Sequence, residues 1–248
     1  MKLKNERHPL LLCAFAFFLM LVFLLAGACT FFLSSLPLAK TIDAMAASGA
    51  CVILDAGHGG EDGGAVGCNG VLEKDLNLSV AFGLAARLRE AGVEVILTRA
   101  EDALLYGEAG NIKGHRKEND LKNRLAVAEE HPDALFVSIH MNSFSVPKYS
   151  GLQVYYAGTE GSCALATCIQ RAVRDRLQPE NKRSVHAAGS SIYLLDHAVG
   201  RAVLVECGFL SNPEECVKLS QKDYQSELCF SIFCGIMEYI KATEGDTA

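Results

Sequence analysis

Short apolar runs alternate with amphipathic stretches from Cys51 onward, and no other feature limits the fold of this chain as much. The first run, CVILDA, is typical of a buried strand, and the stretch over residues 75–92 is typical of a helix that ends at Gly92. Four apolar residues of that stretch share one helical face: Leu76, Val80, Leu84 and Leu88. This alternation indicates an α/β domain.

The same alternation continues almost to the end of the chain. It predicts further strands over residues 93–99, 134–142, 151–158, 191–197 and 201–209, and helices over residues 120–131, 162–177 and 223–244. From Ala100 to Asn119 the sequence is polar with few apolar anchors, so we expect a long surface loop there. The length of 248 residues suits one globular domain, at 51–242, with a tail at 243–248.

An apolar run without charged residues, from 9 to 39, precedes this domain. It exceeds the roughly 7–15 apolar residues of a typical signal peptide and the roughly 20 that span a bilayer. It therefore predicts an uncleaved transmembrane anchor. Removal as a long signal sequence, with cleavage after Ala46, is the alternative. A lipoprotein site at Cys29 is disfavoured because AGAC lacks the usual leucine three positions earlier.

The charge pattern sets the orientation of that anchor and limits the partners of the domain. Basic residues in segment 1–8 precede the run, and only Lys40 follows it closely, which places the N-terminus in the cytoplasm. Beyond a tether at 40–50, the domain is then on the extracytoplasmic face of the membrane. With a net charge of -6 and no basic run after residue 10, nothing favours binding to nucleic acid.

The chain contains ten cysteines, and none of them forms a C-x-x-C motif of the zinc-ribbon or thioredoxin type. Cys13 and Cys29 lie in the apolar N-terminal run, and most of the others lie in apolar strand or helix patterns. This placement favours free cysteines that pack as small buried hydrophobes. One or two disulfides remain compatible with an exported domain.

The loop AGHGGEDGG after the first strand raises the choice between a phosphate site and a metal site. A Walker loop requires Lys-Ser or Lys-Thr, which is absent, and a dinucleotide loop requires a glycine where this chain has Asp62. Glu61 and Asp62 would also repel a phosphate, so the phosphate interpretation is disfavoured. Both acids are candidates only for supporting a metal ligand or facing solvent.

The metal interpretation begins from the polar residues that follow apolar strands. His58 lies just past the first strand and His140 ends the strand at 134–142, so both are expected beyond the carboxyl ends of strands, where ligands gather in α/β sheets. Glu73 precedes the first helix, and Glu206 lies in the apolar strand VLVECGF. Each residue alone has an ordinary structural explanation, and it is their joint placement that favours a site.

These residue types meet a chemical need. Catalytic zinc commonly has two histidines, one glutamate and a water as ligands, and it lowers the pKa of that water to about 7. A further carboxylate must accept the proton of the water and pass it to a leaving amine. We therefore predict His58, Glu73 and His140 as zinc ligands and Glu206 as the catalytic base.

Four motif blocks, VILDAGHGGEDGGAVG, LEKDLNLSVAFGLAARL, DLKNRLAVAEE with ALFVSIHMNSF, and AVLVECGFLSNPEE, resemble those of the zinc-dependent N-acetylmuramoyl-L-alanine amidases, the amidase type 3 family. The resemblance covers about residues 50–241. It implies zinc ligands at His58, Glu73 and His140, a catalytic Glu206, and hydrolysis of the amide between N-acetylmuramic acid and L-alanine in peptidoglycan. It also implies a mixed, roughly six-stranded sheet with helices on both faces. Asn142 is a weaker candidate for orienting the site or contacting substrate.

VECGFLSNPEE, the N-terminal anchor and the lack of wall-binding repeats resemble the CwlD-type sporulation and germination amidases, which take part in making muramic δ-lactam in spore cortex. The chain departs from the common family pattern in having DAGHGG and DGGA where prolines are frequent, and Cys207 where an apolar residue is frequent.

The segment from Ala100 to Asn119 has too few apolar residues to plug the site, so we expect regulation by location or by a partner such as an activating lipoprotein. Two alternatives are a zinc-dependent wall peptidase and an inactive, membrane-anchored wall-binding protein.

Overall fold

The apolar runs form a six-stranded sheet in the computed structural model, which describes residues 19–20, 49–107 and 110–245. Its strands are β1 (Cys51–Ala56), β2 (Glu94–Leu97), β3 (Leu135–Asn142), β4 (Gln153–Tyr156), β5 (His186–Ala187) and β6 (Ala202–Phe209), in the spatial order β2-β1-β3-β6-β4-β5. All neighbouring strands run parallel except β4 and β6. The expected mixed sheet in a single α/β domain is confirmed.

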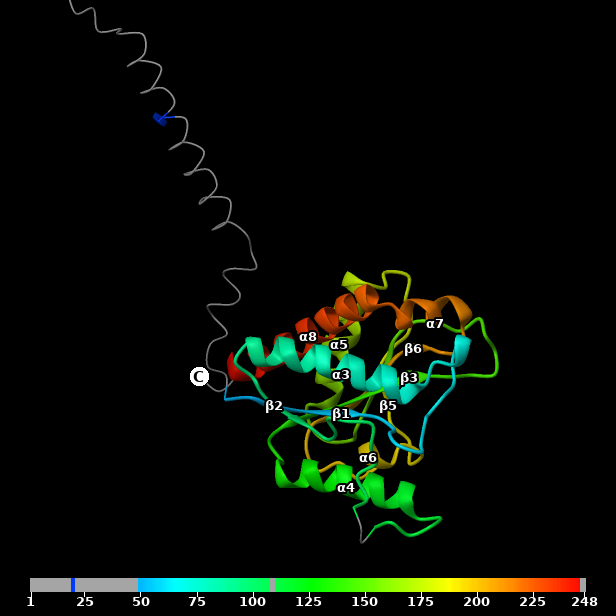
Figure 1. Ribbon diagram of the computed structural model, residues 1–248. Helices are drawn as coiled ribbons and strands as arrows, with labels where there is room; N and C mark the ends of the chain where they lie inside the picture. Colours follow the sequence, from blue (N-terminus) through cyan, green and yellow to red (C-terminus); the bar gives the residue numbers. More distant parts are fainter. Residues whose placement is uncertain (1–18, 21–48, 108–109, 246–248) are drawn as a thin grey trace, which may run out of the picture. The chain divides into compact units, whose positions relative to one another are not determined.

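Helices cover both faces of the sheet (Figure 1). On one face lie α3 (Glu73–Glu90), α5 (Ser162–Arg176) and α8 (Lys222–Gly245), with α8 packed against both α3 and α5. On the other lie α4 (Arg116–Glu130) and the single turn α6 (Tyr193–Asp196). The predicted apolar face of α3 is buried in full, at Leu76, Val80, Leu84 and Leu88. Complete burial of such a side chain contributes about 1.5–3 kcal/mol, so this face fixes α3 on the sheet.

Three elements differ from the sequence-based expectation. Residues 191–197 do not form a strand: Leu194 and Leu195 are both buried, and one helical turn buries adjacent residues where a strand would point them to opposite faces. The edge strand β5 lies earlier in the sequence and has only two residues. Helix α7 (Pro213–Ser220) was not expected, although the side chain of Asn212 caps it by accepting hydrogen bonds from the backbone of Glu214 and Glu215.

The polar segment after β2 is largely the loop that we expected. Its described parts, at 100–107 and 110–115, contain neither helix nor strand, and α4 begins at Arg116, four residues before the expected start. The predicted membrane segment at 9–39 lies outside the described residues except for Leu19 and Met20. Among the helices of the described residues, none combines the length and the apolar character needed to cross a bilayer.

One disulfide joins described residues, between Cys68 in the 3-10 turn η1 (Cys68–Gly70) and Cys216 in α7. It connects the loop before α3 to the helix after β6, across a sequence separation of 148 residues. The other described cysteines are free, and Cys207 and Cys229 are buried, as the sequence patterns suggested. The disulfide therefore ties together two segments that flank the carboxyl end of the sheet.

Replacement of Cys216 with serine should lower the free energy of unfolding by about 2–5 kcal/mol, because the disulfide restricts the unfolded chain over a long loop. Thermal unfolding followed by circular dichroism measures the effect. Cys163→Ser, which removes an exposed free cysteine, is the control and should leave the melting temperature unchanged. A wild-type protein whose melting temperature is indifferent to reductant would contradict this role of the disulfide.

Candidate metal and catalytic site

The three predicted metal ligands lie together at the carboxyl end of the sheet. His58 follows β1, Glu73 is the first residue of α3, and His140 lies in β3. One ligand atom from each lies within 4.8 Å of the others. Glu73 Oε1 lies 3.2 Å from His58 Nε2 and 2.9 Å from His140 Nδ1. Two imidazoles and one carboxylate at this spacing are the donor set that a catalytic zinc ion takes, so the residues present fit the metal.

The carboxylate of Glu73 is the centre of this cluster. Burial alone would raise its pKa, but hydrogen bonds and the charges of His140 and His58 outweigh burial and hold the pKa well below its usual range. Glu73 also accepts hydrogen bonds from the backbone N–H groups of Met141 and Ala65. The carboxylate is thus ionised and fixed before any cation arrives.

Two glycines allow these side chains to approach one another. A Cβ atom on Gly57 would lie 2.2 Å from the imidazole of His140, and one on Gly64, whose φ is +67°, would lie 2.5 Å from Glu73 Oε2. Any larger residue at either position would push a ligand out of place. The glycines of the loop therefore make room for the donor set, in addition to allowing a sharp turn after β1.

The carboxylate of Asp62 lies within ion-pair distance of the His58 imidazole, although Nδ1 has no well-aligned hydrogen bond among the described residues. Asp62 Oδ2 lies 2.9 Å from His58 Nδ1, which leaves Nε2 facing Glu73. The sequence left Asp62 as a supporting candidate, and the structure places it beside a metal-ligand candidate in the way that carboxylates commonly orient zinc-binding histidines. Glu61, by contrast, points to Arg116 on the surface and has no part in the cluster.

The backbone of the loop is held by two buried arginines that sequence reasoning did not select. His58 has a left-handed backbone, with φ of +62°, and its carbonyl accepts a hydrogen bond of 2.7 Å from Arg124 Nη2. Arg124 also donates to the carbonyl of Ala56, and Arg99 donates to the carbonyls of Ala56 and Gly57. These bonds stabilise a conformation that an L-residue rarely adopts.

Arg124 is in turn fixed by two carboxylates. It is 1% exposed and pairs with Asp55 at 2.6 Å and with Asp120 at 2.8 Å. Burial alone would raise the pKa of Asp55, but the charge of Arg124 and hydrogen bonds from Ser138 and Thr98 outweigh it and lower that pKa. The sequence signal for a buried cation such as Arg124 was Asp55 in CVILDA, because a carboxylate inside an apolar strand requires a buried partner.

Glu206 lies next to the metal cluster in β6, with its Cα paired in register with that of His140. Burial raises the pKa of its carboxyl group to about 7, and the charge of Glu73 adds to that rise while those of His140 and His58 oppose it. Its Oε2 atom is buried and has no hydrogen-bond partner among the described residues. A buried carboxyl oxygen without a partner is destabilising, and it is available to a water or a substrate.

Asn142 lies at the end of β3, beyond an irregularity that shifts the register with β6 after His140. It is half-buried, and its backbone carbonyl accepts a hydrogen bond from Leu210. Asn142 therefore lies on the same strand as His140, two residues beyond it, and beside the end of the strand that carries Glu206. Its role in orienting the site or contacting substrate stays a prediction.

With this geometry established, comparison with known proteins decides the family. Residues 52–238 match the family described as N-acetylmuramoyl-L-alanine amidase. The chain belongs to this amidase family. The predicted amidase activity is thereby confirmed, and zinc dependence is general in the family.

The relatives of this amidase include the germination-specific type indicated by its motifs. It is 38% identical to the germination-specific N-acetylmuramoyl-L-alanine amidase of Bacillus subtilis over 193 residues, or 77% of this chain and 80% of the relative. Among solved structures, CwlD of Clostridioides difficile in complex with the GerS lipoprotein is 37% identical with a TM-score of 0.74, covering 78% of this chain and 99% of that one. AmiC2 of Nostoc punctiforme is 31% identical with a TM-score of 0.66, covering 79% of this chain and 99% of that one.

Proposed function

We propose that this amidase binds Zn²⁺ through His58, Glu73 and His140 and hydrolyses the amide between the lactyl group of N-acetylmuramic acid and L-alanine. The observation that carries the proposal is the buried Oε2 atom of Glu206, without a hydrogen-bond partner among the described residues, beside three donor atoms within 4.8 Å of one another. When bound, Zn²⁺ would polarise the scissile carbonyl and lower the pKa of a coordinated water to about 7.

Glu206 would move the proton in this reaction. As the carboxylate it accepts a proton from the attacking water, whose oxygen bonds to the carbonyl carbon. As the acid it returns that proton to the nitrogen of L-alanine when the C–N bond breaks. A pKa near 7 suits both steps at neutral pH, because neither form of the group is then strongly disfavoured. The products are a free lactyl carboxylate and a stem peptide with a free amino terminus.

The place of action follows from the N-terminal sequence and the relatives. Basic residues before the apolar run at 9–39 support a cytoplasmic N-terminus, a membrane anchor and a domain on the extracytoplasmic face of the bacterial membrane. The germination-specific relative supports a role in germination. The resemblance of VECGFLSNPEE to the CwlD-type amidases supports spore cortex maturation with muramic δ-lactam formation as the alternative role. The C. difficile CwlD–GerS complex supports a lipoprotein partner for this chain as well, and we propose that this partner activates it.

Removal of the metal should abolish the activity. Peptidoglycan from vegetative wall and from spore cortex is digested with the full-length protein, with and without a chelator and then with added Zn²⁺. We expect new L-alanine amino termini and free lactyl carboxylates without the chelator, none with it, and recovery with Zn²⁺. Hydrolysis that persists in the chelator would contradict the zinc mechanism.

The same digests separate the two alternative functions. A wall peptidase would release amino termini other than that of L-alanine, because it cleaves within or between stem peptides. An inactive wall-binding protein would bind the wall and release no amino termini. The proposal of an amidase requires L-alanine to be the dominant new amino terminus.

A further inference from the structure

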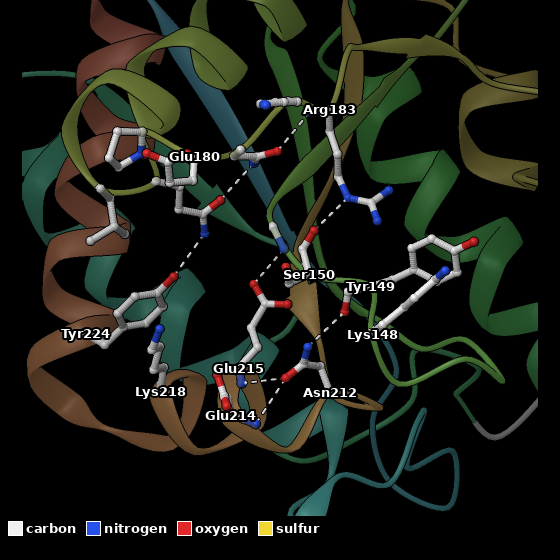
Figure 2. Close-up of a pocket in the computed structure, with 16 residues that line it drawn as sticks. Lys148, Tyr149, Ser150, Glu180, Arg183, Asn212, Glu214, Glu215, Lys218 and Tyr224 are labelled. Carbon is white, nitrogen blue, oxygen red and sulfur yellow. Dashed lines mark hydrogen bonds between the residues drawn. The ribbon is translucent and has the colours of Figure 1, made fainter.

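A polar cavity of about 640 Å³ is lined by none of the predicted metal ligands and not by Glu206, and it has no part in the mechanism described above. Its walls come from the loop before β4, from residues 177–183 after α5 and from the start of α7 (Figure 2). Gln153 at the start of β4 is paired in register with Glu206 on the antiparallel neighbour β6, so their side chains project on the same face. The side chain of Gln153 is in turn bonded to Arg183, a residue of the cavity wall. The cavity is therefore separated from Glu206 by the length of one or two side chains.

Arg183 is held rigidly in the cavity wall. Its Nε donates to the carbonyl of Ser150 at 2.8 Å, and its Nη1 donates to Gln153 Oε1 at 3.0 Å. The guanidinium carbon lies 4.5 Å from the ring centroid of Phe209 and 5.8 Å from that of Tyr149. An arginine that is already stacked and bonded on one edge loses little side-chain freedom when it binds an anion.

The guanidinium nevertheless lacks a carboxylate partner. Arg183 is in no ion pair with a described residue, and its Nη2 donates no hydrogen bond to one. Burial raises the pKa of the nearby Glu215 and the charge of Arg183 opposes that rise, but both Glu215 oxygens accept hydrogen bonds from the backbone N–H groups of Gly151 and Phe209. The remaining lining acids, Glu180 and Glu214, are exposed to solvent. A fixed cation is thus available within the cavity.

Three lysines extend the positive charge around Arg183. Lys148, Lys182 and Lys218 line the same cavity, and no ion pair joins any of them to a described carboxylate. Figure 2 shows Arg183 and Lys148 on one side of the cavity and Lys218 on the other, with Glu215 between them. Four cations and three carboxylates line the cavity, so its lining is positive on balance in a chain whose net charge is -6, and this favours an anionic ligand.

We propose that Arg183 binds the free α-carboxylate of the D-glutamate that follows L-alanine in the stem peptide, an inference that rests on the proposed function. An extended peptide advances about 3.3–3.6 Å per residue, so the residue after L-alanine comes within reach of a group one or two side chains away from Glu206. D-glutamate is linked through its γ-carboxyl group, which leaves its α-carboxylate ionised. That carboxylate matches the free edge of a stacked guanidinium.

The test compares two muropeptide substrates that differ only at this group, one with D-glutamate and one with D-isoglutamine. We expect the wild-type protein to prefer the free carboxylate by about 10- to 100-fold in kcat/KM, the range of one charge-assisted hydrogen bond. Arg183→Met should remove the preference by slowing only the D-glutamate substrate. Arg183→Lys keeps the positive charge but lacks the planar guanidinium group, so it should retain part of the preference for the D-glutamate substrate. Arg174→Met, on the exposed side of α5, is the matched control and should keep the full preference.

Binding of the product peptide provides a readout without turnover. By calorimetry, the free stem tripeptide should bind wild type about 10- to 100-fold more tightly than its isoglutamine form, and Arg183→Met should bind the two equally. Normal hydrolysis with equal rates on both substrates would overturn the role of Arg183 and leave the amidase proposal intact. Release of no L-alanine amino termini from either substrate would overturn the amidase proposal itself.

Discussion

Glu206→Gln is expected to lower kcat for amide hydrolysis by about 10²- to 10⁴-fold, the usual contribution of a positioned acid–base group. Glutamine keeps the size of the side chain and can neither accept the proton of the water nor return it to the amine. Because Glu206 is not one of the three clustered donors, the variant should still bind one equivalent of Zn²⁺. Release of L-alanine amino termini and metal content measured on the same sample test both expectations.

The stability of this variant separates a catalytic role from a structural one. In wild type the buried Oε2 atom has no hydrogen-bond partner among the described residues, so neutralising the group removes an unfavourable burial. The melting temperature of Glu206→Gln should therefore be equal to or above that of wild type. Glu129→Gln, an exposed change on α4, is the control and should leave both rate and stability unchanged. An active Glu206→Gln variant would show that another group carries the proton.

Arg124→Met should produce the largest loss of stability, about 3–5 kcal/mol in the free energy of unfolding. The change leaves Asp55 and Asp120 buried without their cation and removes donors from the carbonyls of Ala56 and His58. Urea unfolding followed by fluorescence or circular dichroism measures it. A second substitution, Asp55→Asn, should restore part of the loss because it removes one uncompensated charge.

The pH dependence of that loss has a definite sign. In wild type the pKa of Asp55 is lowered, so the pair contributes stability above the ordinary aspartate pKa of about 3.9 and loses it as the pH falls toward the folded value. In Arg124→Met the cation is absent, so we expect burial to raise the pKa of Asp55. Protonation of this carboxyl group at low pH then removes the buried charge and restores part of the stability of the variant. The stability gap between the two proteins should narrow as the pH falls from 7 to 4. A gap that is constant over this range would show that Arg124 acts by packing alone.

The candidate site was predictable because its residues interrupt clear local patterns. His58 and His140 each follow an apolar strand, and Glu206 is a lone acid inside one, so each stands out without knowledge of the tertiary structure. Parallel strands place such positions at one edge of the sheet, which is why the four residues meet. Glu73 was the least distinctive of the four candidates in the sequence, because an acid in the first turn of a helix is common and stabilises the helix end without any functional role.

The contacts that support the site were not predictable in the same way. Arg124 lies within a polar helix pattern, and nothing in that pattern shows that its side chain is buried against Asp55 across the domain. The pairing of Cys68 with Cys216 joins segments with no local relation, and several other cysteines offered alternatives. The two-residue strand β5 is fixed by its pairing with β4. These features depend on long-range packing, which local propensity does not encode.

The position of β6 has a consequence for how this hydrolase comes into being. Although β6 is the last strand in the sequence, it lies between β3 and β4 and joins the two halves of the sheet. His58, Glu73 and His140 are synthesised well before the strand that supplies Glu206, so a partly synthesised chain has the proposed metal donors and lacks the proposed catalytic base. On the proposed mechanism, the chain can hydrolyse its substrate only after β6 has been inserted and the sheet is closed. For an enzyme that cuts the wall of its own cell, this order ties the onset of activity to the completion of folding.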